Sequence, residues 1–160
     1  MLRFHSGSVE DTVRLGQRLG KLLQKGDNVC LTGGLGTGKT AFTGGIAKAL
    51  GISEYITSPT FTIVNEYQGR LPLYHLDVYR IGSDIDEVLD VGYDEYIDGN
   101  GVTVIEWADL IRGILPENRI EVAIEKDNDS DASSRLITIS FHGNRTAACE
   151  GRFLNESAGD

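Results

Sequence analysis

A glycine-rich stretch near the start of the chain has the residue types and spacing of a phosphate-binding loop. Residues 31–42 read LTGGLGTGKTAF, in which Gly33, Gly38, Lys39 and Thr40 satisfy the pattern G-x-x-x-x-G-K-[ST]. Glycine has no Cβ, so successive backbone N–H groups can turn toward one anion. The lysine places a cation at the β- and γ-phosphates, and the threonine hydroxyl is a hard oxygen ligand for Mg²⁺. The stretch therefore predicts a site for a nucleoside triphosphate and Mg²⁺.

Two acidic residues stand at the ends of strand-like runs, where such a site needs a carboxylate for the metal ion or its waters. Asp77 ends LYHLD and Glu106 ends VTVIE. Glu106 follows the run with the more buried character, so we assign it to Mg²⁺ together with Thr40. Asp77 would then orient or deprotonate the attacking water. Either residue could instead be a solvated carboxylate at a strand end.

The segment Ser58-Pro59-Thr60 offers two hydroxyls between the first helix after the loop and the next strand. These hydroxyls could meet the γ-phosphate or the metal ion, as switch loops do. Turn and strand-start chemistry, with Pro59 fixing φ, is the alternative, and spacing alone favours it.

Two further side chains lie beside the acidic residues. His75 precedes Asp77 by two positions and so shares its strand face; it could shuttle a proton or simply hydrogen-bond locally. Trp107 follows Glu106 and is more typical of a core anchor than of a base-stacking group.

The elements that position these residues alternate between strand and helix at the start of the chain. A helix begins at Ser8, with Asp11 as a reciprocal capping partner, and ends near Gly26. Close packing against the sheet would explain Gly44 and Gly45 inside the helix after the glycine loop. The remaining patterns predict strands at 28–32, 60–67, 71–78, 102–106, 119–125 and 135–142, and helices at 40–50, 83–91 and 110–115.

This order favours an α/β fold of the P-loop NTPase type: a mostly parallel central sheet with added antiparallel strands and flanking helices. We expect a single domain over residues 1–146 and a disordered C-terminal tail over 147–160.

Composition restricts the function classes. The 160 residues carry 24 acidic and 15 basic side chains, a net charge of -9, and the basic residues are scattered, so tight unaided binding to nucleic acid is not expected. Cys30 and Cys149 have no metal-ligand spacing, and Cys30 fits a reduced thiol inside a strand. No apolar run has the length of a signal peptide core or a membrane span, so we expect a cytoplasmic location and no membrane partner.

Four segments together resemble the TsaE-type P-loop ATPases of bacterial tRNA threonylcarbamoyladenosine biosynthesis. They are GGLGTGKT (33–40), SPTFTIVNEY (58–67), HLDVYR (75–80) and VIEWAD (104–109). Their order and spacing match nearly the whole chain, and their combination is more specific than the glycine loop alone.

The resemblance implies an ATPase that uses ATP and Mg²⁺, with Thr40 and Glu106 as metal ligands and Lys39 and Asp77 in catalytic roles. It makes Ser58 and Thr60 a switch segment and gives Arg135 a nucleotide contact. One departure is Gly34, where the family usually has an acidic residue. The nucleotide-binding residues implied in and near the loop are Gly33, Gly34, Leu35, Gly36, Thr37, Gly38, Lys39, Thr40 and Ala41.

The resemblance further implies an accessory role: the chain would assist the partner proteins TsaB and TsaD, which modify adenosine 37, and would meet tRNA only indirectly. A small-molecule kinase with the same loop is the main alternative, although its arginine lid is not evident. A GTPase switch lacks its N-K-x-D signature here, and a non-enzymatic nucleotide-binding adaptor is the third alternative.

Overall fold

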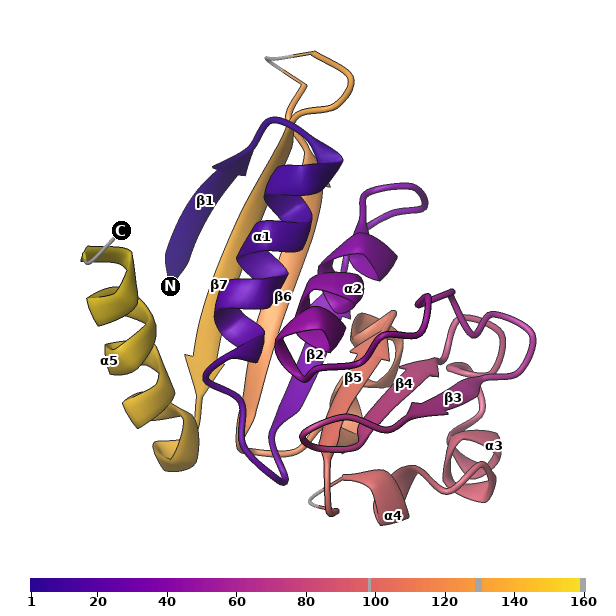
Figure 1. Cartoon of the computed structure of the whole chain (residues 1–160). Helices are drawn as coiled ribbons and strands as arrows, with labels where there is room; N and C mark the ends of the chain where they lie inside the picture. Colours follow the sequence, from indigo (N-terminus) through magenta and orange to yellow (C-terminus); the bar gives the residue numbers. More distant parts are fainter. Residues whose placement is uncertain (98, 129–130, 159–160) are drawn as a thin grey trace.

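Parallel strands form the centre of the molecule. The computed structural model describes residues 1–97, 99–128 and 131–158, and within these ranges seven strands form one sheet in the order β1-β7-β6-β2-β5-β4-β3 (Figure 1). Strands β6, β2, β5 and β4 are mutually parallel, whereas β1, β7 and β3 pair antiparallel with their neighbours. The predicted fold class is therefore confirmed. The strands are β1 (Leu2–Ser6), β2 (Asn28–Thr32), β3 (Val64–Tyr67), β4 (Leu73–Asp77), β5 (Val102–Glu106), β6 (Arg119–Lys126) and β7 (Arg135–His142).

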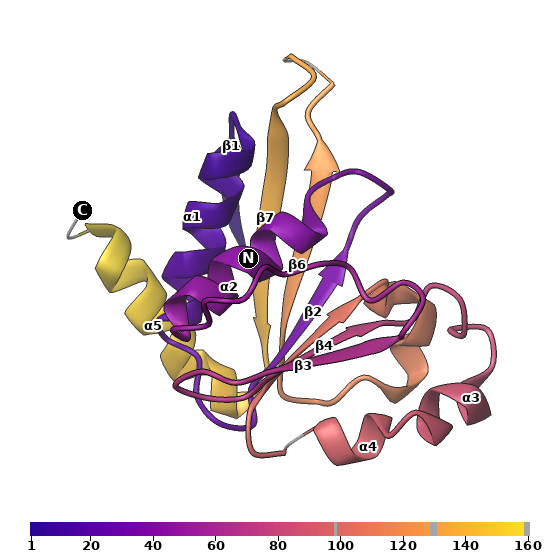
Figure 2. The same ribbon diagram turned by 45° about the vertical axis from the view of Figure 1, so that its right-hand side comes forward.

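Helices cover both faces of this sheet. One core joins α1, α2 and α5 to the sheet, and a second core packs α3, α4 and the 3₁₀ helix η1 on the opposite face (Figure 2). Within the described ranges, none of the helices has the length and apolar character that crossing a bilayer requires. The helices are α1 (Val9–Gly20), α2 (Lys39–Ala49), α3 (Ile85–Asp90), α4 (Tyr93–Tyr96), η1 (Ala108–Ile114) and α5 (Asn144–Ala158).

The first helix begins as predicted but ends earlier. The Ser8 hydroxyl accepts a hydrogen bond from the Asp11 N–H, and the Asp11 carboxylate accepts one from the Gly7 N–H. The helix ends at Gly20, so the prediction of a C-cap at Gly26 is wrong. Gly26 instead lies in the turn before β2, where it has a φ of 88° and donates its N–H to Gly101.

Glycines let α1 and α2 pack closely. A Cβ at Gly45 would lie 2.1 Å from the carbonyl oxygen of Val13, and one at Gly16 would lie 2.2 Å from that of Phe42. Gly45 therefore packs against α1, and the prediction that it packs against the sheet is wrong. The same expectation is wrong for Gly44, whose Cβ would have no neighbour within 4 Å.

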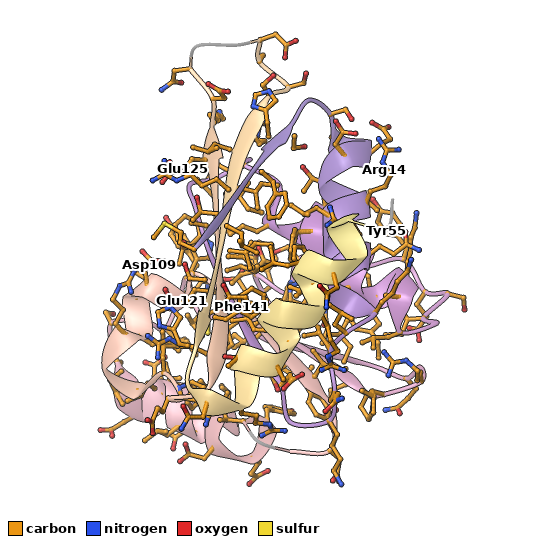
Figure 3. All side chains as sticks on the ribbon, turned by 90° about the vertical axis from the view of Figure 1, so that its left-hand side faces the viewer. Arg14, Tyr55, Asp109, Glu121, Glu125 and Phe141 are labelled. Carbon is orange, nitrogen blue, oxygen red and sulfur yellow. The ribbon has the colours of Figure 1, made fainter. Side chains whose placement is uncertain are left out.

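Three elements were not predicted. One is the short helix α4, which follows α3. Strand β1 lies at the sheet edge beside β7, and helix α5 occupies described residues of the tail that we expected to be disordered. Phe153 of α5 is fully buried, and its ring centroid lies 5.6 Å from that of Phe4 on β1 and 6.3 Å from that of Phe141 on β7. Figure 3 shows the labelled Phe141 beside α5. This aromatic contact orders the tail, so the prediction of disorder is wrong for 147–158, while 159–160 lie outside the described residues.

Candidate functional site

The carboxyl ends of β2, β5 and β4 lie side by side and bring the predicted site together. Asp77 and Glu106 are direct partners in the register of β4 and β5, and Leu31 of β2 is opposite Glu106. The glycine loop, defined here as Gly33–Thr40, leaves β2 at this edge and leads into α2 (Figure 1). A pocket of about 130 Å³ is lined by Leu35, Gly36, Thr37, Gly38, Lys39, Thr40, Ser58, Thr60, Asp77, Glu106 and Trp107.

A second cavity adjoins this pocket. It measures about 200 Å³ and shares Gly36, Thr37 and Gly38 with the first, and it adds Ala41 and Arg135. The predicted nucleotide-binding residues thus line these two adjacent cavities, apart from Gly33 and Gly34, which lie at the base of the loop. Together the two cavities offer room on both sides of the loop.

The glycine loop is shaped as an anion cradle. Gly33 has a φ of 141°, and a Cβ there would lie 2.3 Å from the carbonyl oxygen of Ile124 on β6. Gly38 has a φ of 112° and directly precedes the first residue of α2, so the free N–H groups at the start of that helix follow the loop. Positive φ at glycine and a helix N-terminus are the features that bind phosphate oxygens.

Lys39 crosses this cradle. Its Nζ donates to the carbonyl oxygens of Gly33 and Gly34 at 2.7 Å and 2.8 Å, and lies 4.1 Å from the centroid of the Trp107 ring. Burial lowers the pKa of Lys39 from its ordinary value, while the carboxylates of Glu106, Asp77 and Asp109 oppose this shift. The ammonium is therefore held inside the site.

Trp107 is a site residue that sequence reasoning assigned mainly to the core. Its ring lines the pocket, packs against Tyr79 at 4.7 Å between centroids, and lies beneath the Lys39 ammonium. Its backbone φ of 63° is rare for a residue other than glycine. The Glu-Trp pair at a strand end is the signal that could have placed it here.

Thr40 and Glu106, the predicted metal ligands, are brought together. The Thr40 hydroxyl donates to Oε2 of Glu106 at 3.4 Å, and the same oxygen lies 2.6 Å from Nε2 of His75. Two hard oxygen donors at this spacing beside a phosphate cradle fit Mg²⁺, which usually binds one or two protein oxygens together with phosphates and water.

Asp77 is engaged by the Ser58-Pro59-Thr60 segment. Its Oδ2 accepts hydrogen bonds from the hydroxyls of Ser58 at 3.1 Å and Thr60 at 3.4 Å. Its Oδ1 accepts the Tyr79 N–H at 2.9 Å. Strand β3 begins only at Val64, so strand-start chemistry does not explain these hydroxyls. These hydroxyls instead tie the irregular segment before β3 to Asp77, one of the two site carboxylates.

Arg135 reaches the loop from β7. Its Nε donates to the carbonyl oxygen of Thr37 at 2.9 Å, and its Nη2 donates to that of Gly36 at 3.2 Å. Its Nη1 donates to the carbonyl oxygens of Ala132 and Ser134. Arg135 thus braces the backbone of the glycine loop; a direct contact with nucleotide stays a prediction.

A glycine loop between a buried parallel strand and a helix, with acidic residues at the ends of adjacent strands, defines an α/β protein with a P-loop NTPase-like fold. Within this class, the family model described as threonylcarbamoyl adenosine biosynthesis protein TsaE matches residues 6–137. The chain belongs to the TsaE family, as its motifs predicted.

Individual relatives agree with this placement. The chain is 43% identical over 145 residues to the tRNA threonylcarbamoyladenosine biosynthesis protein TsaE of Bacillus subtilis, covering 90% of this chain and 88% of the relative. It is 46% identical over 123 residues to the TsaE protein of Treponema pallidum, covering 77% of this chain and 90% of the relative. The crystal structure of Bacillus subtilis YdiB superposes with a TM-score of 0.83 at 36% identity, over 98% of this chain and 95% of that one.

Proposed function

We propose that this chain binds and hydrolyses ATP with Mg²⁺ and thereby assists the formation of the threonylcarbamoyl group on adenosine 37 of tRNAs. The observation that carries this proposal is the meeting of the glycine loop with Thr40, Glu106 and Asp77 at one edge of the sheet. The relatives named as tRNA threonylcarbamoyladenosine biosynthesis proteins support the pathway. The partner is a TsaB–TsaD complex, which would act on tRNA itself.

The loop and Lys39 would hold the phosphates. Lys39 now donates to two loop carbonyls inside the cradle, and a triphosphate offers its ammonium stronger, charged acceptors in the same place. Thr40 and Glu106 would hold Mg²⁺, which when bound supplies charge neutralisation at the β- and γ-phosphates. Arg135 keeps the loop backbone in its cradle shape.

Asp77 would orient the attacking water and accept its proton. In the present structure both of its oxygens already accept hydrogen bonds, and two of the donors are the hydroxyls of Ser58 and Thr60. Both hydroxyls donate to Oδ2, so a water that uses this oxygen has to share it with them or displace them. We propose that the Ser58–Thr60 segment has two arrangements, and that nucleotide and partner shift the balance between them.

The Ser58–Thr60 segment is placed to meet a partner. Phe61 follows Thr60 directly and is 84% exposed, with the Arg80 guanidinium 5.7 Å from its ring centroid. A large aromatic side chain exposed beside a site gains most when a second protein covers it. Contact there would act on Thr60 and so on Asp77, and we therefore expect slow hydrolysis by the chain alone and faster hydrolysis with partners.

Phosphate release tests this function. The purified chain is measured with Mg²⁺ and ATP, alone and with TsaB–TsaD, and we expect the complex to stimulate release. Lys39→Ala should abolish it, whereas Lys48→Ala, which changes an exposed lysine on the same helix, should not. Absence of stimulation would refute the accessory role, and ADP formation that depends on an added small metabolite would favour the kinase alternative.

A further inference from the structure

His75 lies behind the predicted metal ligand and is shielded from solvent. It is on β4, its side chain is completely buried, and its Nε2 lies 2.6 Å from Oε2 of Glu106. The contact is diagonal across the strand pair, because His75 is opposite Val104 in the register while Asp77 is opposite Glu106. The imidazole therefore approaches Glu106 from the next strand, on the side away from the pocket.

The surroundings of His75 exclude two simpler roles. A proton shuttle has to reach water or substrate, and a side chain with no exposed surface does not. A filler of the core needs no polar partner, yet the imidazole directs its Nε2 at a carboxylate. Among the described residues its other nitrogen, Nδ1, has no hydrogen-bond partner, so the bond to Glu106 is the polar contact that orients the ring.

Glu106 receives its hydrogen bonds on one oxygen. Oε2 accepts from His75 and from the Thr40 hydroxyl, whereas in the described part of the chain Oε1 accepts none. A carboxylate that accepts two hydrogen bonds on one oxygen has a fixed side-chain torsion, and its other oxygen points in a fixed direction. Groups that orient a metal ligand in this way commonly contribute about 10- to 100-fold to metal affinity.

We propose that His75 is a positioning residue that sets the Glu106 carboxylate for Mg²⁺. This inference rests on the proposed Mg²⁺-dependent binding of ATP, and it adds a residue from β4 to the machinery. Its chemistry is a hydrogen bond from the Nε2–H to a carboxylate oxygen, which His75 maintains whether or not nucleotide is bound. Glutamine can supply a similar N–H at about the same reach, whereas leucine keeps the volume and loses the donor.

The test measures Mg²⁺ dependence separately from nucleotide binding. ATP binding to the full chain is followed by calorimetry across a Mg²⁺ titration and in EDTA, for the wild type, His75→Leu and His75→Gln. We expect His75→Leu to raise the half-saturating Mg²⁺ concentration about 10- to 100-fold. ATP affinity in EDTA should stay within about twofold of the wild type, and His75→Gln should recover most of the Mg²⁺ response.

Controls separate this role from general stability. Thr103→Val also removes one hydrogen bond from a fully buried side chain of β5, whose hydroxyl donates to Tyr96, and it should leave the Mg²⁺ titration unchanged. If His75→Leu does not fold, His75→Gln is compared with His75→Asn, whose shorter amide does not reach Glu106. In that case only His75→Asn should raise the half-saturating Mg²⁺ concentration.

Each outcome decides the inference. A wild type whose ATP binding ignores Mg²⁺ would refute the proposed function and this role with it. A wild type that responds to Mg²⁺ while His75→Leu or His75→Asn responds identically would refute the role of His75 alone. An equal loss of ATP affinity with and without Mg²⁺ would also refute it, since it would indicate a purely structural contribution.

Discussion

Replacing Arg135 by alanine distinguishes two ways in which this arginine could serve the nucleotide site. Family resemblance implies a direct contact with the nucleotide, whereas the structure shows the guanidinium bound to the backbone of the glycine loop. Two of its hydrogen bonds, to Thr37 at 2.9 Å and to Gly36 at 3.2 Å, end on the loop itself. A brace acts on the phosphate cradle, so its loss should weaken every ligand that enters through its phosphates.

The expected magnitude follows from these two bonds. A hydrogen bond from a charged donor contributes about 1.5–3 kcal/mol when buried, but the Arg135 side chain is partly exposed and water replaces some of this on removal. We therefore expect about 1–2 kcal/mol for the pair, which corresponds to roughly 5- to 30-fold in affinity. Arg135→Lys should recover little of this, because an ammonium lacks the planar fork that spans two carbonyls.

Calorimetry with two ligands provides the assay. Mg²⁺-ATP and Mg²⁺-tripolyphosphate are titrated into the wild type, Arg135→Ala and Arg119→Ala; Arg119 begins β6 at the opposite end of the sheet, where it binds Glu121 and the Pro116 carbonyl. Arg135→Ala should weaken both ligands by a similar factor, and Arg119→Ala should weaken neither. If Arg135→Ala weakens ATP alone, the arginine contacts the nucleoside and the bracing role is refuted.

Three further predictions concern the scaffold. Gly45→Ala should destabilise the fold by about 1–3 kcal/mol in a urea titration, since its Cβ would meet backbone atoms of α1 at 2.1 Å, whereas Gly44→Ala should stabilise it by up to about 1 kcal/mol; equal effects would refute the close helix contact. Burial raises the pKa of Cys30 to about 12 and that of Cys149 to about 11, so neither thiol of the native chain should react with alkylating reagents at pH 8. Alkylation should become faster as the pH rises toward these values. Fast labelling of the native chain at pH 8 would contradict the burial of both thiols. Phe153→Ala should cost about 3 kcal/mol and lower the melting temperature, and an unchanged melting temperature would show that α5 does not pack on β1 and β7.

The parts of the site that could be predicted are those whose chemistry is local in sequence. The glycine loop needs particular residues at fixed offsets, and an acidic residue directly after an apolar run marks a strand end. Asp77 and Glu106 could therefore be placed near the loop before their partnership was known. By contrast, the contact between His75 and Glu106 depends on the diagonal register of β4 and β5, which no local pattern specifies.

Two of the missed elements, strand β1 and helix α5, share a different cause. Strand β1 is a five-residue edge strand with exposed Arg3 and His5, so its alternation is short and weak. Helix α5 is mostly polar, and its order depends on Phe153 packing against two paired strands that are distant in sequence. In both cases the tertiary contact, and not the local propensity, determines the structure.

The two site carboxylates are held by different kinds of element, and this difference bears on how the proposed ATPase would be controlled. Glu106 is held by the fully buried His75 of a neighbouring strand and by Thr40 at the end of the glycine loop, and neither residue belongs to the Ser58–Thr60 segment. Asp77 is gripped by the hydroxyls of Ser58 and Thr60, which belong to an irregular loop that continues into the exposed Phe61. Metal binding should therefore be insensitive to a partner, while activation of water should respond to it. It follows that a TsaB–TsaD complex should raise the rate of hydrolysis without changing the Mg²⁺ concentration needed for ATP binding, and a shift in that concentration would contradict this division.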